Sequence, residues 1–516
     1  MESTRTKKGL KNIKVALLFY FCYLFLTFVS RRIFIEYLGA DVLGLNTTAT
    51  SLLQFFNMAE LGISSAVAYS LYKPLYNQDY DEVIRISSVQ GWVFKNLSLL
   101  LLVISAILLA FFPYIFTNMQ LPMWYAYATF IVLLLNPLFG FLFNYRQIVL
   151  TADQKQYKVT AITQIVKILK VFIQILAIVY LENGYLYWLV IEGVFSVLNT
   201  LFLNMIIKKE YPWLETSVKK GYSIRKEYKE ILSKMRQVFV HKIGGYITEQ
   251  STPVIVYSFS SLLSVAIYGN YILVVKGLKI FIIAMFNGVD AGIGNLIVEG
   301  NRSKILGFFW EMFSLKFFLS FIICIAVYEI VDLFMIIWVG EQFLFDKVAV
   351  FLIVINLYIG LTRTTIDSFI AAYGLFQDVW ASVVEAIISL LLTVSLGYFY
   401  GINGILAGVL ITSVLIHFIW KPYFLLRCGL KYSIISYVWN YLKLLLPSLL
   451  LFFVVENTLK NIIVSFSMGE NKSNFSALVN TTLYVSAFAV LLFLLLCFTS
   501  KHFRNFIARV LTLLKR

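Results

Sequence analysis

Two acidic residues occur at matching positions inside long apolar segments of the chain. Glu60 lies in FFNMAELGI and Asp290 lies in MFNGVDAGI, at an offset of 230 residues. The segments also share Asn57 and Asn287, three residues before each acid. An ionisable side chain inside a membrane is costly and usually faces other polar groups or a water-filled cavity. The pattern therefore predicts that these acids and amides help to move a charged solute.

Other ionisable residues lie in similar segments and share helix faces. At 100° per residue, Lys276 and Lys279 fall on the same face as Asp290, within an arc of about 60°. Lys242 and Glu249 are seven residues apart, which also places them on one face. Each of these helices would carry one polar stripe, and the stripes are expected to line a common cavity between two lobes.

Two pairs of charges allow a structural interpretation as well as a functional one. Arg31 and Arg32, in the first apolar segment, could line the cavity or extend to a membrane interface. Arg363 and Asp367 are four residues apart and could neutralise each other on one helix. For every buried charge the alternative is a pair that holds helices together, but the repeated acid favours transport.

A cavity of this composition suits a large anionic or amphipathic solute. Lys and Arg bind phosphate oxygens as point charges or as forks. A carboxylate among them could take up protons and couple transport to a proton gradient. No GxxxxGK[ST] motif occurs, so no ATP site of the usual kind is predicted. We expect no cofactor, with H⁺ or Na⁺ as the possible coupling ion.

The composition is that of a membrane protein. Of 516 residues, 60% are hydrophobic and 14% are charged, with a mean hydropathy of +0.83. Soluble domains carry roughly 25% charged residues. The four cysteines and three histidines are scattered, which argues against a disulfide framework and a metal site. We attribute the net charge of +16 to cytoplasmic loops rather than to nucleic-acid binding.

Unbroken apolar runs of this length predict an all-α polytopic membrane protein with about 14 transmembrane helices. The basic N-terminus precedes an apolar run that is too long for a signal peptide, so we assign it as a retained first span. The predicted spans cover residues 13–36, 44–72, 88–112, 122–148, 159–180, 186–207, 237–260, 265–298, 305–330, 344–373, 379–399, 403–426, 435–455 and 477–498.

The distribution of basic residues predicts the orientation of these spans. With the N-terminus in the cytoplasm, the inside segments contain 29 Lys and Arg residues, and the outside loops contain three to five. Cytoplasmic loops are enriched in Lys and Arg, so both termini are expected in the cytoplasm.

Weaker echoes of the repeat, such as NPLFG and NLYIG at an offset of 220, suggest two six-span lobes. An even number of spans separates Glu60 from Asp290, which predicts a parallel repeat with a pseudo-two-fold axis along the membrane normal. The predicted domains are an N-terminal lobe (1–207), a basic cytoplasmic linker (208–236), a C-terminal lobe (237–426) and two further spans with a basic tail (427–516).

The stretch from residue 37 to residue 71 resembles the first two spans of Wzx-type polysaccharide flippases. These transport lipid-linked oligosaccharides within the multidrug/oligosaccharidyl-lipid/polysaccharide (MOP) exporter superfamily. The shared pattern is Y-L-G, then G-L, then an acid followed by L-G, here Tyr37-Leu38-Gly39, Gly44-Leu45 and Glu60-Leu61-Gly62. The expected span count and the two lobes also agree, so the resemblance covers nearly the whole chain.

The resemblance implies a non-enzymatic function in the bacterial cytoplasmic membrane. Wzx-type proteins flip undecaprenyl-pyrophosphate-linked sugar units to the outer leaflet for capsule, O-antigen or exopolysaccharide assembly. The resemblance also implies a polysaccharide polymerase and chain-length machinery as possible partners. Lys242, Lys276 and Lys279 are the candidates for phosphate or sugar-acid contacts, although the resemblance does not assign them.

Two other functions fit parts of the pattern. A multidrug or cation antiporter of the same superfamily typically has twelve spans, whereas fourteen are predicted here. A membrane-embedded polysaccharide polymerase or ligase needs a sizeable outer loop carrying Arg or His. The longest predicted outer loop, 456–476, contains neither residue type.

Overall fold

The computed structural model describes the backbone of residues 2–117, 119–153, 155–375, 377–460 and 474–514. Within these ranges it does not describe the side chains of residues 2–17, 55–62, 65–66, 234, 236–246, 284, 287–292, 295, 298, 379, 459–460, 475 and 510–514.

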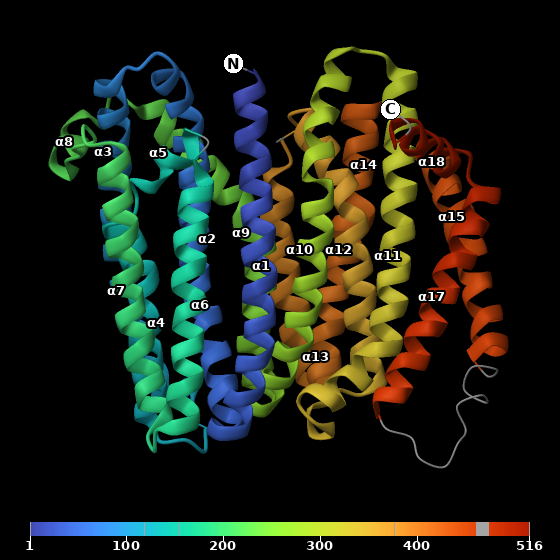
Figure 1. Ribbon diagram of the computed structural model, residues 1–516, viewed down its shortest axis with the longest axis horizontal. Helices are drawn as coiled ribbons and strands as arrows, with labels where there is room; N and C mark the ends of the chain where they lie inside the picture. The colour runs from blue at the N-terminus through green and yellow to red at the C-terminus, as the bar shows by residue number, and fades with distance from the viewer. Residues whose placement is uncertain (1, 118, 154, 376, 461–473, 515–516) are drawn as a thin grey trace. The chain divides into compact units, whose positions relative to one another are not determined.

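Helices make up nearly all of this backbone, and the described residues contain no strand (Figure 1). The α-helices of the first half are α1 (Glu2–Leu38), α2 (Ala40–Tyr76), α3 (Tyr80–Ile115), α4 (Met123–Leu142), α5 (Gln147–Ala152), α6 (Gln156–Tyr180), α7 (Gly184–Glu210), α8 (Val218–Ile224) and α9 (Lys229–Phe259). The second half contains α10 (Leu262–Val298), α11 (Arg302–Trp338), η1 (Glu341–Phe343), α12 (Lys347–Ala372), α13 (Val379–Ser413), η2 (Val414–Trp420), α14 (Lys421–Leu425), η3 (Leu426–Leu430), α15 (Ile434–Val455), η4 (Glu456–Lys460), α17 (Asn474–Thr499) and α18 (Lys501–Leu514).

Each predicted span overlaps helical backbone, which confirms an all-α polytopic membrane protein. The span predicted at 122–148 is too long, because α4 ends at Leu142 and a turn over residues 143–146 precedes α5. Eleven stretches of the described residues are long and apolar enough to cross a bilayer, and one of them, Trp380–Leu430, covers two predicted spans. The two predicted spans outside these stretches correspond to α2 and α9, where many side chains are not described.

Several helices extend beyond the apolar runs that predicted them, because polar residues cap their ends. For α3, the Asp79 carboxylate accepts a hydrogen bond from the Glu82 backbone N–H (3.1 Å), so this helix begins eight residues before the predicted span. In α12, Asp346 caps the start in the same way by accepting from the Ala349 N–H (3.0 Å), although this helix begins three residues inside the span predicted at 344–373. An N-cap carboxylate satisfies N–H groups that have no partner within the helix.

The break inside α13 depends on glycine. Gly401 has φ +57° and separates the two spans predicted at 379–399 and 403–426. Beyond it the chain folds back tightly. A Cβ atom at Gly404 would lie 1.9 Å from the Leu396 carbonyl oxygen, and one at Gly408 would lie 2.8 Å from the Leu392 backbone. Only glycine permits both the positive φ and this approach.

The helices form two compact units. The first consists of Met1–Gly269 with Val379–Leu390, and the second of Asn270–Asp378 with Leu391–Arg516.

In the first unit, α2 packs against α9, α1 against α6, and α6 against α7. Gly44 of α2 lies so close to the Leu262 carbonyl that a Cβ atom would approach it to 2.0 Å. The short helix α8, in the predicted cytoplasmic linker, packs on α3. A Cβ atom at Gly221 would lie 2.0 Å from the Ser88 carbonyl oxygen.

In the second unit, α11 packs against α12, α17 and α18 around an aromatic core. Phe309, Phe317, Phe369 and Phe488 are fully buried there. Burying one such ring stabilises a fold by about 1.5–3 kcal/mol in water. Inside a bilayer the gain comes from packing, because lipid is equally apolar.

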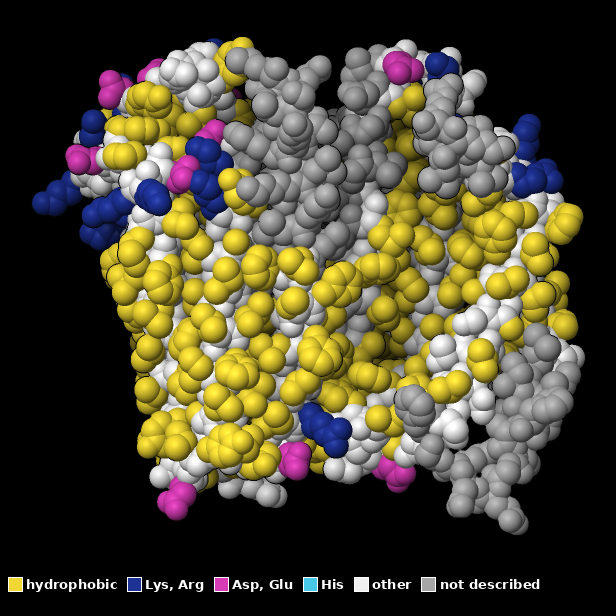
Figure 2. Space-filling view, in the orientation of Figure 1, with side chains coloured by type: hydrophobic (Ala, Val, Ile, Leu, Met, Phe, Trp, Pro, Cys, Tyr) yellow, Lys and Arg dark blue, Asp and Glu magenta, His cyan; other side chains and the backbone are white. Residues whose placement is uncertain are grey.

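The outer surfaces of the helices are apolar at the depth of a bilayer. In the space-filling view, hydrophobic side chains cover the middle of α6 and α7, and charged side chains gather toward the helix ends (Figure 2). Exposed apolar residues on these helices include Leu169, Phe172, Val190 and Val194. A surface this apolar indicates contact with lipid.

Candidate functional site

The predicted site residues fall into two groups. The side chains of Glu60, Asn57, Asp290, Asn287 and Lys242 lie outside the described residues. Seven others are described, namely Arg31, Arg32, Glu249, Lys276, Lys279, Arg363 and Asp367.

In the second unit, α10 carries two half-buried cations one turn apart, Lys276 and Lys279. The Lys279 side chain lies against Gly360 of α12, where its Cε and Nζ atoms would each be 3.0 Å from a Cβ atom. The missing side chain of Gly360 therefore makes room for the lysine. Lys276 forms no ion pair with a described residue.

Helix α12 carries a polar stripe beside these lysines. Asn356, Gly360, Arg363 and Asp367 follow one another at spacings of four, three and four residues, so they share one helix face. Asn356 accepts a hydrogen bond from the Ser413 hydroxyl at 2.8 Å. Lys279 of α10 therefore lies against the face of α12 that also carries Arg363.

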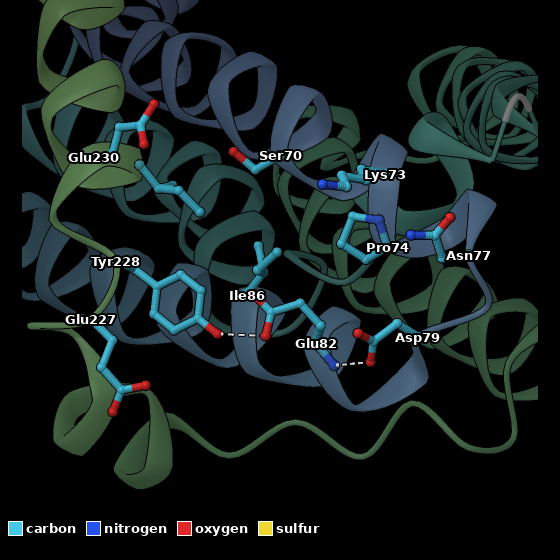
Figure 3. Close-up of a pocket in the computed structure, with 11 residues that line it drawn as sticks. Ser70, Lys73, Pro74, Asn77, Asp79, Glu82, Ile86, Glu227, Tyr228 and Glu230 are labelled. Atoms are coloured by element: carbon cyan, nitrogen blue, oxygen red, sulfur yellow. Dashed lines mark hydrogen bonds between the residues drawn. The ribbon is translucent and has the colours of Figure 1, made fainter.

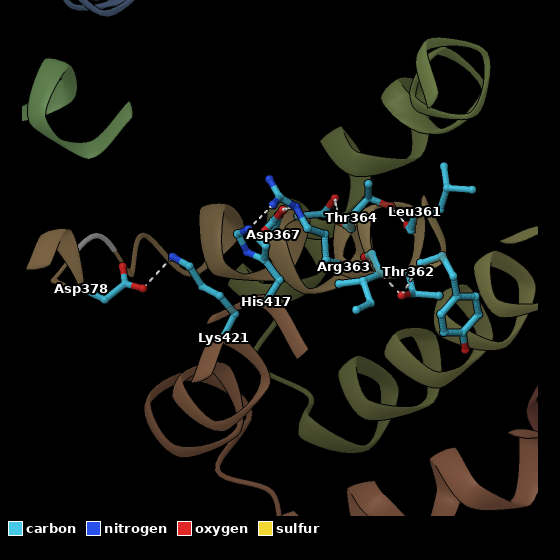
Figure 4. Close-up of polar contacts among 11 residues, drawn as sticks. Leu361, Thr362, Arg363, Thr364, Asp367, Asp378, His417 and Lys421 are labelled. Atoms are coloured by element: carbon cyan, nitrogen blue, oxygen red, sulfur yellow. Dashed lines mark hydrogen bonds and ion pairs between the residues drawn. The ribbon is translucent and has the colours of Figure 1, made fainter. Parts of the chain in front are cut away.

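Arg363 is held from two sides (Figure 4). Its Nε lies 3.1 Å from Asp367 Oδ2, which is the i,i+4 pair expected from the sequence. Its Nη1 lies 2.5 Å from Nε2 of His417 in η2. The Arg363 and Asp367 side chains are 37% and 42% exposed. A charged pair within an apolar span is costly in hydrocarbon, so this exposed surface is suited to water rather than lipid.

A buried ion pair lies close by in the same unit. Lys421 Nζ of α14 is 2.6 Å from Asp378 Oδ2, and the two side chains are 10% and 0% exposed. The pair joins α14 to the segment between α12 and α13 (Figure 4). Its members lie 43 residues apart, and no local spacing rule connects them.

Sequence reasoning also missed Lys316. This residue of α11 is 2% exposed, and its Nζ lies 4.8 Å from the centre of the Phe286 ring of α10. An ammonium over an aromatic face gains a cation–π attraction. The signal was available in the sequence, because Lys316 interrupts the run MFSLKFFL, but no second lysine occurs at a matching repeat position.

In the first unit, Arg31 of α1 lies against the start of α10. Its Nη2 is 3.5 Å from the Ala266 carbonyl oxygen, and a Cβ atom at Gly269 would come within 2.4 Å of it. Arg32 and Glu249 are exposed. Glycine thus makes room for a cation in each unit, for Arg31 in the first and for Lys279 in the second.

The first unit also contains a charge cluster between α6 and α7. Lys170 Nζ lies 2.6 Å from Glu192 Oε1, and Gln174 donates a hydrogen bond to the other carboxylate oxygen at 3.0 Å. The Lys170 and Glu192 side chains are 21% and 10% exposed. Lys170 is therefore neutralised within the helix pair.

A pocket of about 410 Å³ lies where residues 227–231 meet the end of α2 and the start of α3 (Figure 3). Its acidic lining contrasts with the cations of α10 and α12. Tyr228 donates a hydrogen bond to Glu82 (2.9 Å), and Glu227 pairs with Arg85. Burial, together with the bond to Glu82, raises the pKa of Tyr228 to about 12. These contacts attach the linker to α3. The acidic residues of the pocket are Asp79, Glu82, Glu227 and Glu230.

The described residues contain no cluster of three or more His, Cys, Asp or Glu side chains with the geometry of a metal site. The predicted site residues of the second unit whose side chains are described are instead three cations, Lys276, Lys279 and Arg363, and one acid, Asp367. Such cations bind phosphates and carboxylates rather than metal ions.

Solved structures of several transporters have a similar arrangement of helices. A multidrug resistance MATE family transporter of the MOP superfamily, in an inward-facing conformation, matches with a TM-score of 0.61 at 12% identity, covering 81% of this chain and 99% of that one. The lipid II flippase MurJ, in an inward closed conformation, matches with a TM-score of 0.63 at 14% identity, covering 93% of this chain and 97% of that one. The chain shares the fold of these two structures.

A eukaryotic MATE transporter also matches, with a TM-score of 0.54 at 14% identity, over 83% of this chain and 97% of that one. No protein-family model matches the sequence. No curated protein matches it either. At identities this low the likeness establishes the fold, and the substrate must be argued from the residues.

Proposed function

We propose that this protein flips an undecaprenyl-pyrophosphate-linked oligosaccharide from the inner to the outer leaflet for surface polysaccharide assembly. The observation that carries the proposal is the set of cations on α10 and α12, within a fold shared with a lipid II flippase. Lys276, Lys279 and Arg363 offer N–H donors to phosphate or sugar-acid oxygens. A drug cation would be repelled by the same groups.

The extent of the structural matches favours a lipid flippase over a drug antiporter. The match to the MATE structure spans 99% of that structure but only 81% of this chain. The match to the flippase spans 93% of this chain. The predicted C-terminal extension, 427–516, contains 90 of the 516 residues, about the share that the MATE match leaves uncovered. Helices α15, α17 and α18 occupy this extension.

In the proposed mechanism the cations bind the charged head of the lipid while its hydrocarbon chain stays in the bilayer. The protein alternates between states open to either side, and an ion gradient drives the cycle. Glu60 and Asp290 are proposed to line the path and to exchange the coupling ion. We propose that both termini lie in the cytoplasm, from the distribution of Lys and Arg, and that the membrane is the bacterial inner membrane, from the resemblance to Wzx-type flippases.

Depletion of the protein in its native host tests this function directly. A leaflet-restricted probe would report which face of the membrane holds the lipid-linked oligosaccharide. We expect accumulation on the cytoplasmic face, with loss of surface polysaccharide. Complementation should succeed with the wild type and with Gly307→Ala, whose new Cβ atom meets no heavy atom within 4 Å. It should fail with the double variant Lys276→Gln/Lys279→Gln.

Two results would contradict the proposal. Normal export with altered drug sensitivity would indicate an antiporter. Normal delivery of the lipid-linked units to the outer leaflet, with only their polymerisation lost, would indicate a polymerase or ligase.

A further inference from the structure

Helix α18 differs from the membrane spans because it has one basic side and one apolar side. At 100° per residue, Lys501, Arg504 and Arg509 fall within an arc of about 140°. Phe503 and Ile507 fall on the opposite side. Residues 501–516 contain five Lys or Arg residues and no Asp or Glu. A helix of this pattern typically lies in the plane of a membrane interface instead of crossing the bilayer.

The start of α18 lies at the end of the last membrane span. Helix α18 runs across the end of α17 instead of continuing along it (Figure 1). The Ser500 hydroxyl oxygen accepts a hydrogen bond from the Phe503 backbone N–H at 3.2 Å, which caps the new helix. Phe498, in the last turn of α17, is 80% exposed and therefore suited to contact with lipid. Lys501 follows three residues later, so α18 begins at the level of the lipid head groups.

Contacts with α11 and α17 hold α18 in one rotation about its own axis. Phe503 is fully buried, and its ring centre lies 5.4 Å from that of Phe318 in α11 and 5.6 Å from that of Phe493 in α17. Arg509 Nη2 lies 3.1 Å from Glu311 Oε2 of α11. The apolar side of α18 thus packs against the second unit, and Arg509 is neutralised there.

Two cations of α18 remain exposed on its outer side. Lys501 and Arg504 form no ion pair with a described residue. Phe506, at the edge of the apolar side, is half-buried. In the space-filling view, Lys and Arg side chains border the hydrophobic surface at this end of the second unit (Figure 2). Cations at head-group level attract anionic phospholipids, and each Lys or Arg near such a surface strengthens binding about fivefold.

We propose that the outer side of α18 is a binding site for the head groups of anionic phospholipids, with Lys501 and Arg504 as the contact residues. Their N–H groups donate hydrogen bonds to phosphodiester oxygens of the surrounding leaflet. The bound lipid belongs to the bilayer and is not the transported solute. The inference therefore does not depend on the proposed function.

Hydrogen–deuterium exchange of the full chain tests this site in two kinds of nanodisc. One kind contains phosphatidylcholine alone, and the other contains phosphatidylcholine mixed with phosphatidylglycerol. Exchange of residues 501–509 should be about tenfold slower in the mixed nanodiscs, because two cations each contribute up to about fivefold. A NaCl concentration of about 1 M, at which the Debye length falls to about 3 Å, should remove most of the slowing.

Paired variants show which cations are responsible. In Lys501→Gln/Arg504→Gln, exchange of residues 501–509 should become nearly equal in the two kinds of nanodisc. Lys208→Gln/Lys209→Gln is the matched control, because it removes two exposed lysines from the last turn of α7 that form no ion pair with a described residue. This control should keep the slowing seen in the wild type.

Three results would overturn the lipid site. The first is equal exchange of 501–509 by the wild type in both kinds of nanodisc. The second is a slowing that persists in Lys501→Gln/Arg504→Gln, with folding of the variant checked by thermal unfolding. The third is an equal slowing when inorganic pyrophosphate is added to phosphatidylcholine nanodiscs, which would indicate a site for soluble phosphate compounds. A protein that shows the predicted slowing but flips no lipid-linked oligosaccharide would keep the lipid site and lose only the flippase function.

Discussion

Lysines occur between α6 and α7 in the first unit and on α10 in the second, and the residues around them differ. Between α6 and α7, Lys170 is neutralised by Glu192, whose second carboxylate oxygen is bonded to Gln174. On α10, Lys276 has no ion-pair partner among the described residues, and Lys279 lies against a glycine of α12. Lys170 is thus part of a buried ion pair, whereas Lys276 forms no ion pair with a described residue.

The contrast shows how intramembrane charges can be assigned to roles. A pair with short N···O distances and little exposure joins helices and cannot bind a passing solute without breaking. A half-buried cation that forms no ion pair with a described residue, such as Lys276, is a candidate for binding a solute. Deletion of a charge should therefore affect stability at α6 and α7 and transport at α10 and α12.

The largest effect is expected from breaking the buried pair. Glu192→Ala leaves Lys170 without its carboxylate inside the membrane, and we expect a loss of about 3 kcal/mol of unfolding free energy. Thermal unfolding of the purified protein would measure this loss. The double variant Lys170→Met/Glu192→Met should regain most of the stability, because no charge stays unpaired. If Glu192→Ala were as stable as the wild type, the Lys170–Glu192 pair would not stabilise the fold, and the two regions would not differ in role.

The second effect concerns transport. Lys276→Gln and Lys279→Gln should each lower the flipping rate about tenfold, because each removes a charge-assisted hydrogen bond to the solute. Their unfolding temperatures should stay close to that of the wild type, unlike that of Glu192→Ala. Lysine variants with a lowered unfolding temperature but a normal flipping rate would show that these residues stabilise the fold instead.

A smaller effect is expected from filling the space beside Lys279. In Gly360→Ala the new Cβ atom meets Lys279 Cε and Nζ at 3.0 Å, and the flexible lysine end must move. We expect flipping to fall about threefold, with stability changed by less than about 1 kcal/mol. Gly307→Ala is the matched control, since its Cβ atom meets nothing within 4 Å and should leave flipping unchanged. Equal rates for the two variants would remove the positioning role of Gly360.

The smallest effect concerns acid sensitivity at α18, outside the membrane-spanning stretches. Burial, followed by the charge of Lys501, lowers the pKa of His502 below its usual 6.5. A lowered pKa in the folded state means that this stability is present above pH 6.5 and is lost as the pH falls below it. Limited proteolysis of α18 should therefore be faster at pH 5 than at pH 7.5. His502→Gln should remove this difference.

Local patterns predicted the helices well, because an apolar run of about 20 residues is long enough to cross a bilayer, however the helices pack against one another. They also predicted the Arg363–Asp367 pair, whose members are four residues apart on one helix. They did not predict the role of Gly360, and the scattered histidines gave no sign that His417 meets Arg363. The site residues Glu60, Asn57, Asp290, Asn287 and Lys242 stay predictions, since their side chains are not described.

The sequence by itself determined that the chain is a bundle of membrane-spanning helices and which residues carry charge inside it. Both properties follow from local composition and helical periodicity. Only the tertiary structure decided which charges are neutralised: Lys170 by Glu192, Lys421 by Asp378, and Arg363 by Asp367 with His417 beside it. Three of these four contacts join residues 22 to 54 positions apart. Such contacts depend on how helices pack and rotate against one another, which the pattern of one helix does not specify.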